Sequence, residues 1–346
     1  MLRHEMLRGL AARLWQRDPR DAHDGSVTDA STPCRTALTS GSRITRRTIL
    51  RQMQFSARNT PSQPVKANRR LYSAVVDSKP KYLRQAERLV WSLREHLHVA
   101  QENIILHAIG TDSDYPSDWI ERIDVPLKFV DAHPSHPYCN KLQAFPSLAS
   151  LPWDDVVLLD CDTFLLDSPP QNLTSIQAKI VDFANPPDSV LRALFSAAQL
   201  PYRCAVTHVG AEPTVFGNAN GGVYIIPHHA FRRLWPSWLR WSDWCMKHLD
   251  LFQDWSIHID QVSFAMALAE TGLNFTELDQ IWNFPTHIKD DRLGDCEPKI
   301  LHYHSQVDET GILLEIATLE RATESIRIVN SSLARLYSDE GHIAGD

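Results

Sequence analysis

The chain has 346 residues, of which 43% are hydrophobic and 22% charged, and its formal net charge is −7. This composition is typical of a globular protein and excludes a chain that is disordered throughout. The acidic balance argues against a general nucleic-acid-binding protein, which needs a basic surface to meet phosphates. No run of 18 or more apolar residues occurs, so the sequence predicts no transmembrane anchor.

The cysteines and the first residues bear on the compartment. Six cysteines are widely spaced and include no Cys-x-x-Cys pair. In a chain of this length they indicate free thiols in a reducing compartment rather than a disulfide framework. The first residues lack the continuous apolar stretch of a secretory signal. Together these features predict a cytoplasmic protein.

The beginning of the chain is basic although the whole chain is acidic. Residues 1–66 hold 12 Lys or Arg against 5 Asp or Glu. Residues 18–66 are rich in Ser, Thr, Arg and Pro and show little apolar periodicity, which is typical of disorder. We interpret residues 1–66 as a basic, disordered extension. A targeting peptide, or a contact with an acidic membrane or partner, is the alternative.

From residue 71 onward, strand and helix patterns alternate. Apolar runs predict strands at 71–77, 104–110, 127–130, 155–166, 218–227 and 300–303. Helical spacing predicts helices at 81–98, 141–151, 229–248, 261–271 and 309–337. This order predicts a single α/β domain at 67–310 with a mostly parallel central sheet flanked by helices, followed by a helical, polar tail at 311–346. Ligands of such sheets bind beyond the carboxyl ends of the strands.

The most informative pattern lies where the most apolar strand ends. Asp160 and Asp162 follow four aliphatic residues and flank Cys161. Side chains at i and i+2 of a strand share a face, so the two carboxylates would lie together. Burying two carboxylates is unfavourable unless a cation pairs with them, and hard divalent cations prefer carboxylate oxygens. We therefore predict a metal site here; a pair of turn-capping carboxylates is the alternative.

Five short motifs resemble, in sequence order, those of GT-A fold nucleotide-sugar glycosyltransferases. The resemblance is strongest to glycogenin and the lipopolysaccharide galactosyltransferases of family eight. The motifs are Val75, Val76 and Asp77 with Tyr82; Asn140, Lys141 and Leu142 ahead of Asp160 and Asp162; Asn220, Gly221, Gly222 and Val223; Asp260 and Gln261; and Leu301, His302 and Tyr303. The resemblance covers residues 71–304 and implies a GT-A fold. It also implies an enzyme that transfers a hexose from a UDP-sugar with retention of configuration.

The same resemblance assigns roles to these residues. It implies that Asp160, Asp162 and His302 bind a metal ion, with His304 as the alternative to His302. Mn²⁺ is favoured slightly over Mg²⁺ because one ligand is a nitrogen. The resemblance places the nucleobase and ribose at Val76, Asp77 and Tyr82, and the donor sugar at Asn220, Gly221 and Gly222. The catalytic candidates are Asp260, Gln261 and Lys141.

Physical arguments support three of these assignments. A divalent cation would act as a Lewis acid on the leaving nucleoside diphosphate. Lys141 could pair with the diphosphate or with Asp162, and such a fixed charge stabilises a transition state by several kcal/mol. Gly221 and Gly222 carry no Cβ, so a ligand could approach their backbone closely.

The sequence also departs from the family pattern. After His302 it lacks the glycine and the Lys-Pro-Trp segment that normally follow, and that lysine usually helps to bind the diphosphate. The acceptor stays open between a carbohydrate, a lipid-linked molecule and a protein. The alternative functions are a sugar nucleotidyltransferase, a nucleotide-sugar hydrolase, or a nucleotide-sugar binding module without activity.

Two further patterns have structural explanations. Four tryptophans recur every three residues, which favours core packing over an acceptor platform: Trp235, Trp238, Trp241 and Trp244. His133 and His136 have the spacing of metal ligands but no third ligand nearby in the sequence, so we expect a polar loop there.

Overall fold

The computed structural model describes residues 68–339, apart from residues 135, 172–173, 184 and 289–290. The predicted extension at 1–66 and the end of the predicted tail therefore lie outside the described residues. Among the described helices, none combines the length and apolar composition that crossing a membrane requires.

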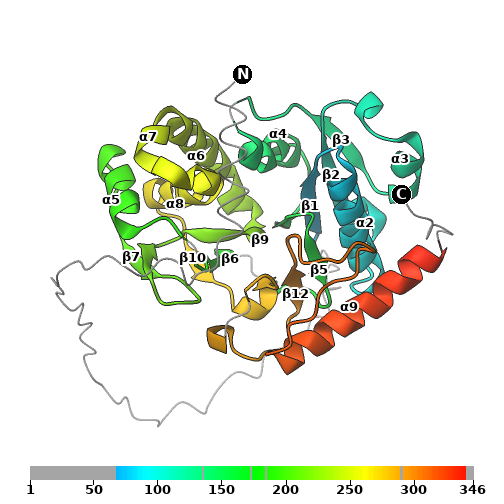
Figure 1. Cartoon of the computed structure of the whole chain (residues 1–346). Coiled ribbons are helices and arrows are strands. Elements are labelled where there is room, and N and C mark those ends of the chain that lie inside the picture. The colour runs from blue at the N-terminus through cyan, green and yellow to red at the C-terminus, as the bar shows by residue number, and fades with distance from the viewer. Residues whose placement is uncertain (1–67, 135, 172–173, 184, 289–290, 340–346) are drawn as a thin grey trace, which may run out of the picture. The chain divides into compact units, whose positions relative to one another are not determined.

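A seven-stranded sheet forms the centre of the described part, in the order β10-β6-β9-β4-β1-β2-β3 (Figure 1). Only β9 runs antiparallel to its neighbours in this sheet, so the predicted α/β class with a mostly parallel sheet is confirmed. Its strands are β1 (Arg70–Val76), β2 (Ile104–Ile109), β3 (Leu127–Val130), β4 (Asp155–Leu159), β6 (Ile176–Ile180), β9 (Ala219–Pro227) and β10 (Phe275–Glu277).

Helices cover both faces of this sheet, because its central strands carry apolar side chains on both faces. In β4, Val156 and Leu158 belong to one buried cluster, whereas Val157 and Leu159 belong to another. The first cluster packs against α4 (Phe145–Ala149), α5 (Asp188–Ala197), α6 (His228–Lys247), α7 (Leu249–Phe252) and α8 (Ile259–Thr271). The second packs against α2 (Pro80–Glu95) and α3 (Ser117–Ile123).

The apolar strand predicted within 155–166 is present as β4, but it does not continue to the end of that range. It breaks after β4, because the amide and the hydroxyl of Thr163 both donate to the carbonyl of Asp160, at 3.1 and 2.7 Å. The chain turns at 160–162 and continues as β5 (Thr163–Leu165) in a second sheet. This three-stranded sheet has the order β11-β12-β5 and contains β11 (Phe284–Pro285) and β12 (Ile300–His302). A small hairpin, β7 (Cys204–Val206) with β8 (Pro213–Val215), completes the strands described.

Two predicted helices also begin or end elsewhere. Instead of a helix at 141–151, a 3₁₀ helix (Pro137–Ala144) leads into the short α4, whose first turn contains Pro146. Further 3₁₀ turns lie at Gln101–Asn103, Asp112–Asp114, Gln253–His258, Gln280–Trp282 and Asp291–Leu293. The helix predicted at 309–337 begins only with α9 (Glu320–Asp339). The Asp308 carboxylate accepts from the amides of Thr310 and Ile312, and Gly311 has φ +86°, so this stretch forms a turn.

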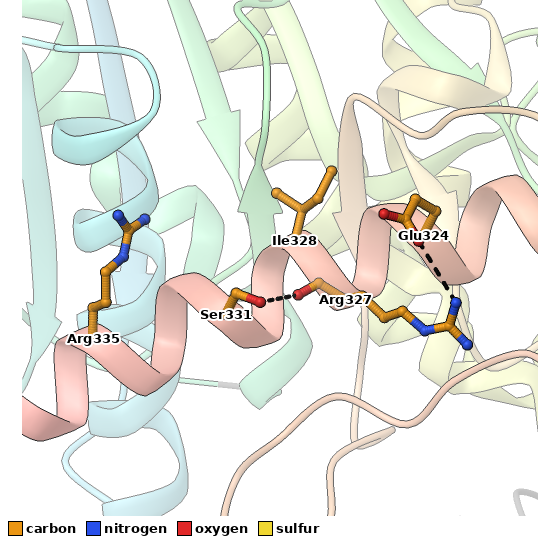
Figure 2. Close-up of a pocket in the computed structure, with 5 residues that line it drawn as sticks. All are labelled: Glu324, Arg327, Ile328, Ser331 and Arg335. Atoms are coloured by element: carbon orange, nitrogen blue, oxygen red, sulfur yellow. Dashed lines mark hydrogen bonds and ion pairs between the residues drawn. The ribbon is translucent and has the colours of Figure 1, made fainter.

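The C-terminal helix α9 packs behind the three-stranded sheet. Its buried residues include Ile326, Val329 and Leu333, which share a cluster with Leu301 and Tyr303. The Ser332 hydroxyl lies 2.9 Å from Trp91 Nε1 and 3.0 Å from His96 Nε2 of α2. The opposite side of α9 is exposed and bears a shallow pocket, which Figure 2 shows with its lining residues Glu324, Arg327, Ile328, Ser331 and Arg335. Through the apolar contacts on its buried side, α9 supports the strand that carries His302.

We expect Leu333→Ala to destabilise the protein by about 2–5 kcal/mol, because Leu333 is fully buried. Ile328→Ala on the same helix is the matched control, since Ile328 is 48% exposed, and should cost less than about 1 kcal/mol. Urea unfolding of the full chain measures both. Equal losses for the two variants would contradict the packing of α9 against β12.

Candidate functional site

The turn at 160–162 lies where the central sheet passes into the three-stranded sheet. Ala74 is paired with Leu159, so the end of β1 lies beside this turn. The Cys161 thiol donates to the carbonyl of Val75 at 3.1 Å and is thereby directed away from the two carboxylates. The amide of Asp160 donates to the carbonyl of Gly222 at 3.0 Å, which ties the turn to β9. Asp160 and Asp162 are thus brought together by a turn, whereas the sequence pattern predicts that strand alternation does so.

Lys141 lies among the carboxylates of this turn. Its Nζ is 2.7 Å from Asp160 Oδ1 and donates to the carbonyl of Gly221. A Cβ on Gly221 would be 3.1 Å from this Nζ, 3.4 Å from Asp260 Oδ2 and 3.5 Å from Asp160 Oδ2, so these groups surround one point of β9. Burial alone would lower the pKa of Lys141, but Asp160 and Asp260 outweigh this effect and leave the pKa raised. Lys141 is therefore a cation held among acids.

Asp260 is the third carboxylate of the site and lies at the start of α8. Its carbonyl accepts from Trp238 Nε1 at 3.0 Å, and Trp238 is fully buried, so the indole fixes the first turn of α8. Burial raises the pKa of Asp260 to about 6; Lys141 opposes this rise and Asp160 adds to it. Gln261 follows on the same turn, with its Oε1 3.3 Å from His258 Nδ1.

Two histidines from β12 and the residues after it face Asp162. His302 Nε2 is 3.3 Å from Asp162 Oδ1 and 3.9 Å from Asp160 Oδ2, whereas His304 Nδ1 is 3.8 Å from Asp162 Oδ2. The two imidazole rings stack with centroids 3.9 Å apart. The backbone of His304 has a left-handed φ of +50°. Burial alone would raise the pKa of Asp162, but the two histidines outweigh it and hold the pKa below its usual range.

These residues fit a divalent cation. Asp160, Asp162 and Asp260 together carry more negative charge than Lys141 neutralises, and the excess when all three are ionised equals the charge of one divalent ion. One ligand atom each from Asp162, His302 and His304 lies within 4.8 Å of the others. Neighbouring ligands of an ion with bonds of about 2.1 Å lie roughly 3 Å apart. The 3.3 Å separation between His302 Nε2 and Asp162 Oδ1 is of this size.

The two glycines of β9 differ in what they leave room for. A Cβ on Gly222 would lie 2.4 Å from His302 Nδ1 and 2.7 Å from Asn283 Oδ1. The space beside Gly222 is therefore filled by protein atoms and is not open to a ligand. Gly221 faces Lys141 and the carboxylates instead. The expectation that both glycines allow close approach of a ligand is thus compatible with the geometry of Gly221 only.

The residues expected at the nucleotide lie at the carboxyl end of β1. Val76 is fully buried, and its carbonyl accepts from the Tyr115 hydroxyl at 2.9 Å. Asp77 accepts from the amide of Lys79 at 3.1 Å, and Tyr82 is 36% exposed at the start of α2. The ammonium groups of Lys79 and Lys81 lie 5.6 and 5.8 Å from the centre of the Tyr82 ring. Two lysines and an exposed ring therefore stand beside this strand end.

Asn283, which no sequence pattern marks as a site residue, contacts His302. Asn283 is fully buried, and its Oδ1 lies 3.1 Å from His302 Nδ1. The one signal in the sequence is a polar residue enclosed by apolar neighbours, Trp282 and Phe284. Such a residue is usually hydrogen-bonded when buried, but the sequence does not name its partner.

The remaining sequence patterns are structural. Trp238 is fully buried, Trp241 is 9% exposed, and Trp235 and Trp244 pack partly buried against the same cluster. His133 lies in an irregular segment before the Pro137–Ala144 helix and is 3.9 Å from Asp243.

Of the comparisons with known proteins, the one with solved structures finds similar chains. No protein-family model matches the chain, and no curated protein matches its sequence. Among solved structures, the chain is similar to the galactosyltransferase LgtC in complex with donor and acceptor sugar analogues. The two are 14% identical over 75% of this chain and 95% of that chain, with a TM-score of 0.45.

Two other solved structures are similar to a comparable degree. Mouse xyloside xylosyltransferase 1 is 16% identical over 68% of this chain and 97% of its own, with a TM-score of 0.42. The glycosyltransferase GlyE of Streptococcus pneumoniae is 16% identical over 79% of this chain and 64% of its own, with a TM-score of 0.44. All three of these proteins are glycosyltransferases. The function proposed below rests on the residues of the site in this chain.

We expect Gly222→Ala to weaken Mn²⁺ binding by about 10-fold or more, because the new methyl group would displace the His302 ring. Gly221→Ala is the matched control, since its Cβ would meet the flexible end of Lys141 at 3.1 Å, and it should change Mn²⁺ affinity less. Calorimetric titration with Mn²⁺ measures both. An unchanged affinity in folded Gly222→Ala would argue against His302 as a ligand.

Proposed function

We propose that this protein is a metal-dependent glycosyltransferase that uses a nucleotide-sugar donor, with UDP as the expected nucleotide. The observation that carries this proposal is the convergence of Asp160, Asp162, Lys141 and His302 at the carboxyl end of the central strands. Such a group of acids with one lysine suits a divalent cation and a diphosphate together, since the cation is held by the acids and the phosphates are met by positive charge. The order of the motifs along the chain supports the same reading.

The protein residues have distinct roles in this proposal. Asp160, Asp162 and His302 hold the cation. The alternative to His302 is His304, whose Nδ1 lies 3.8 Å from Asp162 Oδ2. The bound cation, Mn²⁺ or Mg²⁺, supplies Lewis-acid stabilisation of the leaving diphosphate. Lys141 adds a second, fixed positive charge at the same place, because Asp160 and the Gly221 carbonyl hold its ammonium group.

The donor sugar is assigned to the space beside Gly221, Asn220 and Asp260. Asp260 is close to Lys141, and its pKa of about 6 allows it to accept hydrogen bonds or a proton near neutral pH. With Gln261 it is the candidate for contact with the reacting sugar. Retention of configuration and a hexose as the sugar follow from the motif resemblance alone.

The contacts with the nucleoside and the identity of the acceptor are assigned more broadly. Asp77 and Tyr82 are proposed to contact the ribose and base, because the exposed Tyr82 ring stands at the end of β1. The acceptor is a carbohydrate, a lipid-linked molecule or a protein. The cytoplasmic location stays a prediction from the sequence.

We expect UDP to bind only weakly without Mn²⁺ and at least about 10-fold more tightly with it, since a cation held by the acids would offset the negative charge of the diphosphate. Asp160→Asn with Asp162→Asn should abolish the Mn²⁺-dependent gain, whereas Asp243→Asn, at a largely exposed acid outside the site, should keep it. Calorimetric titration of UDP measures this. Binding that ignores both Mn²⁺ and the double substitution would contradict the metal-site proposal.

We expect Lys141→Met to lower kcat for UDP release by about 10²-fold or more, because the leaving diphosphate loses a fixed positive charge. The assay is release of UDP from a panel of UDP-sugars, with and without sugar acceptors. Lys128→Met, at a lysine of β3 outside the site, is the control and should leave kcat unchanged.

The UDP-release assay, together with an assay of pyrophosphate release, separates the alternative functions. UDP release that an acceptor accelerates supports transfer, whereas equal release without acceptor favours a hydrolase. Release of pyrophosphate from a nucleoside triphosphate and a sugar phosphate would instead show a nucleotidyltransferase.

A further inference from the structure

A chain of hydrogen bonds connects the backbone of β9 to the ring of His302. The amide of Gly222 donates to Asn220 Oδ1 at 3.0 Å. Asn283 Nδ2 donates to the same oxygen at 3.1 Å. Asn283 Oδ1 is in turn 3.1 Å from His302 Nδ1. We call Asn220 and Asn283 the amide relay.

The directions of these bonds follow from one fixed donor. A backbone N–H can only donate, so the Asn220 atom that faces Gly222 has to be the carbonyl oxygen. That oxygen accepts, so the group of Asn283 beside it has to be the NH₂ group. The other atom of the Asn283 amide is then its oxygen, and His302 Nδ1 has to donate to it. The relay therefore defines which ring nitrogen of His302 carries a proton.

The hydrogen bond between Asn283 and His302 is buried, so water cannot readily take the place of either partner. Asn283 is fully buried and His302 is 3% exposed, so water has little access to the bond between them. Leaving a buried polar group without its partner costs about 1–3 kcal/mol. Gly222 covers the same bond: a Cβ there would meet both His302 Nδ1 and Asn283 Oδ1 closer than 3 Å. Gly222 thus both begins the relay and leaves the space for its last bond.

The amide relay also determines which nitrogen of the His302 ring can bind a metal ion. With Nδ1 occupied by its proton, Nε2 is the nitrogen whose lone pair can bind a metal ion. Nε2 is also the atom that faces Asp162 and Asp160, at 3.3 and 3.9 Å. A ligand histidine is commonly oriented through a hydrogen bond from its other nitrogen, and loss of that bond typically weakens metal binding about 10–100-fold.

We propose that Asn220 and Asn283 are positioning residues that hold His302 in the tautomer and orientation needed to bind the divalent cation through Nε2. The inference rests on the proposed metal-dependent function and names two residues that act on the metal through His302. It also limits the expected role of Asn220 toward a sugar. The oxygen of Asn220 is used within the protein, so its Nδ2 is the group left to donate to a donor hydroxyl.

Mn²⁺ affinity of the full chain tests the proposal without any assay of activity. The electron paramagnetic resonance signal of free Mn²⁺ reports the fraction bound. Asn283→Leu should weaken binding about 10–100-fold, because the ring loses its acceptor. Asn283→Asp should retain most of the affinity, because its carboxylate can still accept from Nδ1. Asn330→Ala is the matched control: Asn330 of α9 also makes two hydrogen bonds, to the Leu313 backbone, and its loss should lower stability but not Mn²⁺ affinity.

The outcomes separate this inference from the proposed function. If the wild type binds no Mn²⁺, the proposed function itself fails. If the wild type binds Mn²⁺ and folded Asn283→Leu binds it equally well, the relay is overturned while the metal site stands.

A second measurement keeps the proposal testable if Asn283→Leu does not fold. Long-range ¹H–¹⁵N spectra of the wild type, labelled with ¹⁵N-histidine and without metal, show which nitrogen of each neutral imidazole carries the proton. His302→Gln assigns the signal. A proton on Nδ1 is expected, and a neutral ring protonated on Nε2 would overturn the relay.

Discussion

Negative charge accumulates at one turn of the chain, and the surrounding elements have to compensate for it. Asp160, Asp162 and Asp260 converge around Lys141 where the chain leaves the central sheet for the three-stranded sheet. Carboxylates that share a partly buried site repel one another and lose hydration, so the arrangement is stable only with compensating positive charge. Lys141 supplies part of that charge, and a divalent cation is proposed to supply the rest.

The surrounding elements are built to hold this turn in one geometry. β9 runs antiparallel to β4 and presents the Gly221 and Gly222 carbonyls to Lys141 and to the turn. Trp238 fixes the start of α8, and α9 packs behind the strand that carries His302. Elements far apart in the sequence therefore meet at the site, and the amide relay gives the histidine its direction.

Much of the fold follows from local patterns, and the exceptions have physical reasons. The strands β1, β2, β3 and β9 and the helices α2, α6 and α8 lie close to their predicted ranges, because each has a clear apolar run or an apolar period. The strand β6 was not predicted, although its apolar residues alternate with Gln177 and Lys179, a pattern that is typical of a strand with one exposed face. Lys179 is nevertheless fully buried, with its Nζ 2.6 Å from the Asp182 carboxylate. The pairing that permits this burial is tertiary information.

The α/β class and the chemical types at the site can be read from the order of the residues: two acids after an apolar strand, a lysine before it, two glycines and a late histidine. These are local properties of composition and order. Three features depend on the folded chain: a turn brings Asp160 and Asp162 together, Gly222 makes room for His302, and Asn283 contacts the His302 ring. The bond from Asn283 to Asn220 spans 63 residues of sequence, and that from His302 to Asn283 spans 19. Contacts of that separation depend on how β9, β11 and β12 pair and pack, which no local pattern specifies.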